Sequence, residues 1–80
     1  MKELLGYVSG LIVNEKDKVS VTEIDEPMMR KYIIKVSKND TKNIIGREGK
    51  TIKAIRSLIS MASINKGLKK KTPVEIVDED

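Results

Sequence analysis

Residues 44–56 read Ile-Ile-Gly-Arg-Glu-Gly-Lys-Thr-Ile-Lys-Ala-Ile-Arg, and this stretch decides the fold. Its two glycines, Gly46 and Gly49, stand three residues apart between two segments whose apolar residues have helical spacing. Glycine permits positive φ angles and, having no Cβ atom, lets a ligand approach the main chain closely. The first amides of the following helix attract anions, and Arg47 and Lys50 add positive charge. The stretch therefore predicts two helices joined by a phosphate-binding loop, although a plain helical corner would carry the same glycines.

The whole chain has 80 residues, which is enough for one small domain around this loop. Apolar spacing, turn residues and helix-end signals predict the order α-β-β-α-α-β. The second and third strands are joined through two helices, and such a connection is long enough for a parallel crossover. We therefore expect an α+β domain over residues 1–80, with a three-stranded mixed sheet, three helices on one face and an acidic tail at 78–80. The expected helices are 2–13, 41–45 and 50–66, and the expected strands are 19–24, 29–36 and 72–77.

Individual side chains refine this expectation. In the second strand, alternation places Tyr32 on one face with two other apolar residues and Ile33 on the other, which indicates burial on both faces. Asp40 is a candidate N-cap for the short helix, and Gly67 is a candidate C-terminal cap for the long one. The side chains expected to face inward from the two longer helices are Leu4, Leu5, Val8, Leu11, Ile12, Ile52, Ile55, Ile59 and Ala62.

Two glycines, Gly6 and Gly10, lie inside the expected first helix. Each costs about 1 kcal/mol of helix stability relative to alanine. Their presence therefore indicates that another element or a second chain approaches this helix closely.

The composition excludes several classes of function. The chain has no Cys and no His, so disulfides, Cys/His metal sites and imidazole catalysis are all absent. Its only aromatic residues are Tyr7 and Tyr32, which disfavours the domains that stack several bases on aromatic side chains. No apolar run approaches the roughly 20 residues of a membrane-spanning helix, and acidic Glu3 argues against a signal peptide. We expect a cytoplasmic binding protein without enzyme activity, metal, cofactor or small-molecule substrate.

The charge is distributed unevenly along the chain. The net charge is +4, but residues 41–71 carry nine Lys/Arg against one acidic residue, Glu48. Residues 1–40 are neutral overall, and residues 72–80 are acidic. A basic block inside a folded domain indicates a polyanionic partner, nucleic acid before membrane. A solvated lysine face has the same composition, so charge alone leaves both interpretations open.

In this setting, residues 44–55 resemble the KH-domain signature Ile-Ile-Gly-x-x-Gly-x-x-Ile-x-x-Ile. The order of elements resembles the type II, bacterial-style KH fold, and the length is similar to that of the small single-KH bacterial RNA-binding proteins of the KhpA family. The resemblance implies that about four nucleotides of single-stranded RNA bind across the glycine loop. The residues that it implies at the RNA are Ile45, Gly46, Arg47, Glu48, Gly49, Lys50, Ile52, Lys53, Arg56, Lys69, Lys70 and Lys71.

Within this set the resemblance implies different roles. The backbone of residues 46–49 holds phosphates, and the loop at 69–71 flanks the groove. Glu48 departs from what a phosphate site favours and should weaken affinity, unless it points away or pairs with a lysine. Ile44 is expected in the core. The candidates for either groove floor or core are Ile45 and Ile52. The candidate phosphate partners are Lys50 and Lys53, with Arg56 a weaker one.

The resemblance also implies a homodimer or a heterodimer with a second KH protein of the KhpB type. It further implies an RNA chaperone in post-transcriptional regulation linked to cell-wall growth and cell shape. Two alternatives stay open: a helix-turn-helix that reads duplex DNA with residues 50–66, and a protein-interaction module with a vestigial RNA site. A nucleotide-binding P-loop is disfavoured, because its first glycine would fall at Ile44.

Overall fold

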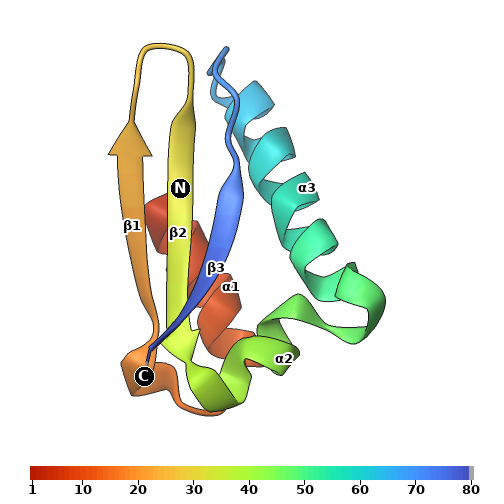
Figure 1. The fold of residues 1–80 in the computed structure, drawn as a ribbon. Helices are drawn as coiled ribbons and strands as arrows, with labels where there is room; N and C mark the ends of the chain where they lie inside the picture. Colours follow the sequence, from red (N-terminus) through yellow and green to blue (C-terminus); the bar gives the residue numbers. More distant parts are fainter. Residues whose placement is uncertain (80) are drawn as a thin grey trace.

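One three-stranded sheet with helices on one of its faces makes up the domain (Figure 1). The structure is a computed structural model and describes residues 1–79. Its helices are α1 (Lys2–Ile12), α2 (Thr41–Ile45) and α3 (Lys50–Asn65), and its strands are β1 (Ser20–Asp25), β2 (Arg30–Ser37) and β3 (Val74–Glu79). Short 3-10 turns stand at Lys16–Lys18, Lys38–Asp40 and Arg47–Gly49. The predicted order α-β-β-α-α-β is confirmed.

The sheet has the strand order β1-β2-β3 and is mixed, as predicted. β1 and β2 form an antiparallel hairpin, whereas β2 and β3 are parallel, with Tyr32 opposite Val74. β3 begins two residues later than expected, after Pro73, and continues through two residues that the sequence placed in an acidic tail. These residues, Asp78 and Glu79, pair with the end of β2, and Asp80 lies outside the described residues.

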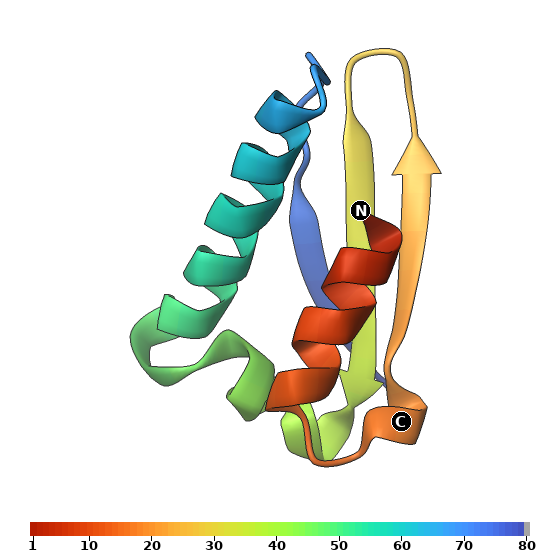
Figure 2. The ribbon, with the colours of Figure 1, turned by 180° about the vertical axis from the view of Figure 1, so that it is seen from behind.

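The core lies between the sheet and the helices. Tyr32, Ile34 and Val36 of β2 are fully buried on the face that the helices cover. Figure 2, which views the molecule from behind, shows α1 and α3 on this face of the sheet. On the opposite face of β2, Ile33 is only half-buried and Lys35 is exposed. The expectation that β2 is buried on both faces is therefore wrong, because no second layer covers the open side within residues 1–79.

Helix α1 packs less regularly than its apolar spacing predicted. Leu5 is fully buried as expected, but Leu11 is 68% exposed. Leu4, Val8 and Ile12 pack against the core as predicted, and Ser9 is fully buried as well. No atom lies within 4 Å of the Cβ that Gly6 or Gly10 would carry as alanine. Close packing inside one chain therefore does not explain these two glycines.

Helix α3 follows its predicted pattern closely. Its three isoleucines at 52, 55 and 59 are buried, although Ser63 rather than Ala62 completes the buried row. Gly67 has φ +72° and donates its amide to the Ile64 carbonyl at 2.9 Å, while the Leu68 amide reaches the Ser63 carbonyl at 2.9 Å. This pair of bonds is the Schellman motif. The predicted role of Gly67 as the helix cap is confirmed.

Asp40 stands at the N-cap position of α2, but its carboxylate makes no cap hydrogen bond to that helix. It is fully buried and accepts backbone hydrogen bonds from Asn14 at 2.8 Å and Glu15 at 2.9 Å. The Asn43 side chain donates a third bond at 2.9 Å. These donors lower the pKa of Asp40, the two backbone amides most strongly. The predicted N-cap position is therefore confirmed, but the Asp40 carboxylate bonds to the connection after α1 and to the Asn43 side chain instead of capping the first amides of α2.

Asp40→Asn should lower the melting temperature at pH 7 by roughly 5 °C or more, because one of two strong acceptors is lost. The folded-state pKa of Asp40 lies below its ordinary value of 3.8. Its contribution to stability is thus fully present above the unfolded-state pKa and disappears as the pH falls from about 4 through the folded-state pKa. Thermal melts followed by circular dichroism at pH 7 and pH 3 measure this. The wild type should lose more stability between these two pH values than Asp40→Asn does.

Asp17→Asn provides the matched control, because Asp17 is exposed on a 3-10 turn. It should melt like the wild type at both pH values. Equal losses between pH 7 and pH 3 in the wild type and in Asp40→Asn would show that Asp40 does not carry the acid sensitivity.

Candidate nucleic-acid interface

The glycine loop, residues 46–49, joins α2 to α3 and has positive φ angles at three of its four residues, Gly46, Glu48 and Gly49. Gly46 has φ +79° and ψ 175°, and Gly49 has φ +74° and ψ 15°, so both glycines use the conformational freedom that the sequence offered. A Cβ atom on Gly46 would lie 2.2 Å from the Thr51 Oγ1 atom and 2.8 Å from its backbone nitrogen. Gly49 has no such overlap. Gly46 is therefore required by space as well as by conformation, and the role of Thr51 in this requirement could not be read from residue spacing.

Glu48, at the tip of the loop, has φ +56° and ψ 26°, although it is not a glycine. A side-chain-bearing residue in the left-handed region costs roughly 1–2 kcal/mol. Such strain tends to be kept where it serves a ligand or switch. Glu48 is exposed and has no ion-pair partner within residues 1–79. The predicted conflict between its carboxylate and a phosphate is thus not removed by pairing with a lysine.

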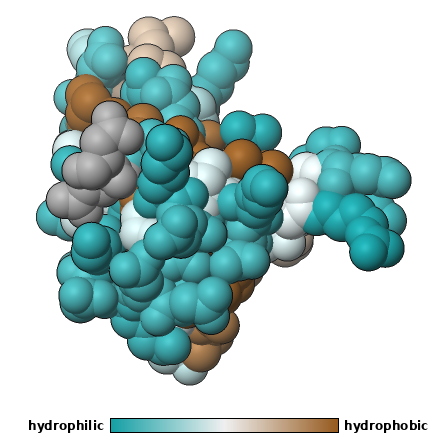
Figure 3. All heavy atoms as spheres, turned by 60° about the horizontal axis from the view of Figure 1, so that its bottom comes forward, coloured by the Kyte–Doolittle hydropathy of each residue, from teal (hydrophilic) through white to brown (hydrophobic). Residues whose placement is uncertain are grey.

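The basic residues around the loop face solvent. Arg47, Lys50 and Lys53 are exposed, and in the described part of the chain none of them forms an ion pair. Figure 3 shows the segment between α2 and α3 as a mostly hydrophilic lobe that projects from the body, with hydrophobic surface where the lobe joins it. Three cations without ion pairs, Arg47 on the loop and Lys50 and Lys53 on the first turn of α3, form a surface that a phosphate chain can approach without first breaking internal ion pairs.

The start of α3 adds backbone donors to these charges. Gly49 occupies its N-cap position and offers no side-chain hydrogen bond to the first amides of the helix. The first four amides of any α-helix lack an intrahelical acceptor. They carry the positive end of the helix dipole, which favours anions. The 3-10 turn before this 16-residue helix accepts the Gly49 and Lys50 amides at the Gly46 and Arg47 carbonyls. The amides that follow them and the adjacent cations therefore attract the same kind of ligand.

The isoleucines of the stretch divide between core and surface. Ile44 is fully buried, as predicted for a core residue. Ile52 is 6% exposed and belongs to the same core cluster. Ile45 is 37% exposed, immediately before Gly46. Of the two candidates for a groove floor, Ile45 is the one whose side chain reaches the surface, whereas Ile52 is part of the core.

Arg56 has a partner within the chain. Its Nε and Nη2 atoms donate to the backbone carbonyl of Val74, at 3.3 and 3.2 Å. β3 is an edge strand that pairs only with β2 in the sheet. Arg56 thus connects α3 to Val74, the first residue of β3, on the unpaired edge of that strand. A phosphate contact by Arg56 stays a prediction and would compete with this bond.

Residues 69–71 lie at the opposite end of α3 from the glycine loop (Figure 1). The helix between them has 16 residues, which corresponds to about 24 Å. Lys70 contacts the Asp25 carboxylate at 2.6 Å, and Arg30 also bonds to it. Lys70, and then Arg30, lower the pKa of Asp25. The structure therefore splits the predicted site: the loop residues gather at one end of α3, and Lys69 and Lys71 stay exposed at the other.

The described residues offer neither a metal-binding cluster nor a helix suited to crossing a membrane. Residues 1–79 hold no group of three or more acidic, Cys or His residues placed to bind a metal ion. Over the same residues, none of the helices combines the length and the apolar character that crossing a membrane requires.

Comparison with known proteins gives a consistent result. The sequence model of the KH domain of KhpA/KhpB matches residues 2–76. The RNA-binding protein KhpA of Chlamydia pneumoniae is 39% identical over 80 residues, or 99% of each chain. That of Chlamydia trachomatis serovar D is 39% identical over 79 residues, again 99% of each, and that of Thermotoga maritima is 40% identical over 60 residues, or 75% of this chain and 80% of the relative. With the loop geometry described above, these matches show that the chain belongs to the KhpA family of KH-domain RNA-binding proteins.

Proposed function

We propose that this protein binds about four nucleotides of single-stranded RNA across the glycine loop, as a binding protein without catalytic activity. The observation that carries the proposal is the loop itself: two glycines with positive φ angles open the backbone beside the uncapped start of α3. Single-stranded RNA suits such a site, because its phosphates are accessible and its bases can turn toward the protein.

The proposal gives each part of the loop a task. The amides of Gly46, Gly49 and Lys50 already donate to carbonyls of the chain, so the other backbone amides of the loop and of the first turn of α3 hold the phosphates. The exposed side chains of Arg47, Lys50 and Lys53 add charge-assisted contacts. Ile45 provides apolar surface for a base. Glu48 reduces affinity without preventing binding, because the main contact is made by the backbone rather than by its side chain.

A salt series should show weak to moderate binding with a shallow salt dependence. Each phosphate neutralised on a single strand contributes about −0.7 to the slope of log K against log salt concentration. With two to four phosphates contacted, we expect a slope of roughly −1.4 to −2.8. Fluorescence anisotropy with matched single-stranded RNA and duplex DNA measures it.

The measurement with duplex DNA tests the helix-turn-helix interpretation. Single-stranded RNA should bind more tightly than duplex DNA at every salt concentration, since Arg56 is already bonded to Val74 on the side of α3 toward β3. Tighter binding to the duplex would instead support α3 as a recognition helix and reject the proposed single-stranded ligand.

We also propose a cytoplasmic RNA chaperone that pairs with itself or with a KhpB-type KH protein, in post-transcriptional regulation linked to cell-wall growth and cell shape. Support for the pairing comes from the matched family, whose description covers both KhpA and KhpB. It comes also from α1, where Tyr7 and Leu11 are each 68% exposed beside two glycines that intrachain packing leaves unexplained. A partner helix laid against this surface would account for both features.

Replacing Gly6 and Gly10 together by alanine should stabilise the monomer and weaken self-association. Open space surrounds both positions, so the gain in helix propensity of about 1 kcal/mol per site should be realised and raise the melting temperature. The added methyl groups would hold a partner helix away. Sedimentation velocity over a concentration series measures association, with Ser57→Ala on α3 as a control that should leave it unchanged. Monomers at all concentrations for both proteins would remove the self-pairing idea.

A further inference from the structure

Strand β1 forms a free edge of the sheet. Within residues 1–79 it pairs with β2 alone, and Figures 1 and 2 show no other segment along its outer side. Glu26 and Met29, just beyond the strand ends, exchange both backbone hydrogen bonds, at 2.8 and 3.3 Å. Because residues of an antiparallel ladder point alternately toward and away from their neighbour, the backbone groups of Val21, Glu23 and Asp25 face away from β2. These three residues therefore offer unpaired amides and carbonyls to another strand.

The two edges of the sheet differ in their protection against such pairing. Natural edge strands are commonly protected by lysine, proline or a bulge. β3 follows Pro73, and Arg56 occupies the Val74 carbonyl on the unpaired side of β3. β1 contains no lysine or proline, and its pairing with β2 runs over residues 20–25 without a bulge. β1 is therefore the edge at which a further strand can be added.

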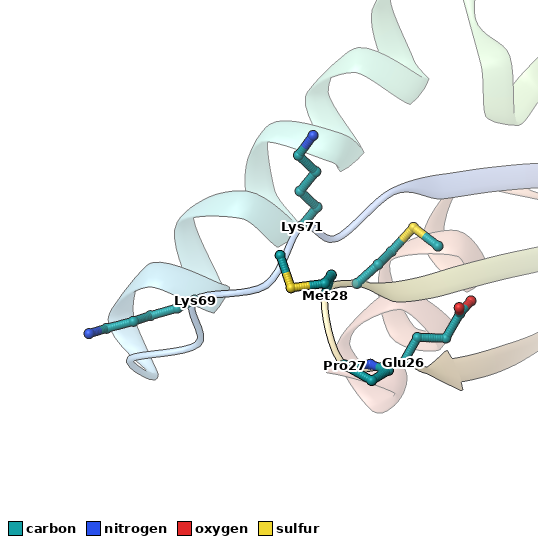
Figure 4. Close-up of a pocket in the computed structure, with 6 residues that line it drawn as sticks. Glu26, Pro27, Met28, Lys69 and Lys71 are labelled. Atoms are coloured by element: carbon teal, nitrogen blue, oxygen red, sulfur yellow. The ribbon is translucent and has the colours of Figure 1, made fainter.

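The opposite flank of β2 is occupied even before β3 begins. There the Arg30 amide donates to the Lys71 carbonyl at 2.8 Å, and the Lys71 amide donates to the Met28 carbonyl at 3.4 Å. Figure 4 shows this connection beside the β1–β2 turn, with a pocket between the two. The pocket lies on the β3 side of the turn, so a strand added along β1 leaves it open.

Charge selects one antiparallel register for two copies of β1. Pairing between outward-facing residues allows two arrangements that overlap most of the strand, one centred on Thr22 and one centred on Glu23. The second sets Glu23 opposite Glu23 of the other copy, and like charges directly opposite one another are destabilising. The first sets Val21 opposite Glu23 of the other copy and opposes no like charges. β1 is thus complementary to itself in the register centred on Thr22.

We propose that β1 pairs with β1 of a second copy across a two-fold axis at Thr22, which joins the two sheets into one. The inference rests on the proposed self-pairing and assigns it an edge. Each copy uses the same patch, so the contact closes as a dimer instead of extending into a fibre. Val21 packs against the core, so Thr22 lies on the open face of the sheet, where it is exposed.

The arrangement leaves the proposed RNA site free. Figures 1 and 2 both show the glycine loop on the opposite flank of the domain from β1. The axis is perpendicular to the sheet, so the helices of both copies lie on the same face of the joined sheet. Of the two longer helices, α1 is the nearer to β1 (Figure 2), so the two α1 helices lie nearest the axis.

Opposite charges at Thr22 test the axis. Thr22→Lys and Thr22→Asp each place two like charges opposite one another in the dimer, and each should weaken self-association at least about tenfold. An equimolar mixture of the two variants should recover the association of the wild type, since each lysine then faces an aspartate. Sedimentation velocity over a concentration series measures the association, and circular dichroism melts check that each variant folds.

Ser20→Lys and Ser20→Asp are the matched controls, because Ser20 is exposed on the same face of β1 but lies opposite Ile24 of the other copy. Each should associate almost like the wild type, with no gain on mixing. A wild type that stays monomeric, Thr22 variants that associate unchanged, or a loss that mixing does not restore would each overturn the proposal. All variants should bind a four-nucleotide RNA like the wild type, so a wrong edge is distinguished from a wrong RNA site.

Discussion

Arg47→Asp combined with Glu48→Asp should abolish RNA binding and leave the fold intact. Both side chains are exposed at the tip of the glycine loop, so stability should change by no more than about 0.5 kcal/mol. Aspartate also tolerates the left-handed backbone at position 48, where φ is +56°. The pair Arg47 and Glu48 is neutral, whereas two aspartates place two negative charges where phosphates must approach. Such like-charge contacts can cost several kcal/mol, enough to bring a modest affinity below detection.

The measurements are a circular dichroism melt and anisotropy with one four-nucleotide RNA. Lys16→Asp is the matched control, because it changes the net charge by the same amount at an exposed site on a separate 3-10 turn. It should bind almost as the wild type does. The assignment of the glycine loop as the RNA site would be wrong if the double aspartate variant melted normally and still bound with wild-type affinity.

Gly46→Ala should be the most destabilising single substitution in the loop. Its Cβ would overlap the Thr51 side chain and approach the Thr51 backbone nitrogen to 2.8 Å, and its φ of +79° with ψ of 175° belongs to a region that only glycine readily adopts. Strain and overlap together should cost about 3 kcal/mol or more. For a domain of this size that lowers the melting temperature by roughly 12 °C or more.

Gly49→Ala is the natural comparison, three residues further on. Its φ of +74° with ψ of 15° is the ordinary left-handed region, and an added Cβ atom would lie 4.0 Å from the Lys53 Cε atom. It should cost only about 1–2 kcal/mol. Thermal melts of both variants give the comparison directly. Equal losses of melting temperature would show that the Thr51 side chain can move aside at little cost. The requirement for glycine at position 46 would then be conformational alone.

Most of the fold was predictable because its signals are local. The glycines at 46 and 67 mark a loop and a helix end by their own backbone freedom, and β-branched alternation marks the strands. Every helix and strand limit falls within two residues of its prediction. The errors have a tertiary cause instead. Leu11 has the right spacing to face inward, but the path of α1 over the sheet leaves it exposed.

The candidate site was predictable as a loop, but the partners of its charged residues were not. In the sequence nothing distinguishes Lys70 from the lysines beside it. In the structure it donates to the carboxylate of Asp25, 45 residues earlier in the chain. Arg56 has the spacing of an exposed cation, and a carbonyl 18 residues later accepts its hydrogen bonds. Asp40 has the residue type of a helix cap, but the two backbone amides that it accepts, Asn14 and Glu15, lie in the connection after α1. Contacts across such distances depend on how the elements pack, which helical and strand periodicity do not specify.

The parallel pairing of β2 with β3 has a consequence for folding during synthesis. Tyr32 of β2 pairs with Val74, which the ribosome adds 42 residues later. At about 5–20 residues per second, one edge of β2 waits roughly 2–8 seconds for its partner. Until β3 has been added, β2 lacks its partner on this edge, and the basic segment at 41–71 has no β3 beside it. A nascent chain that paused there would present an unpaired strand edge, open to aggregation, before it had the surface that we propose for RNA.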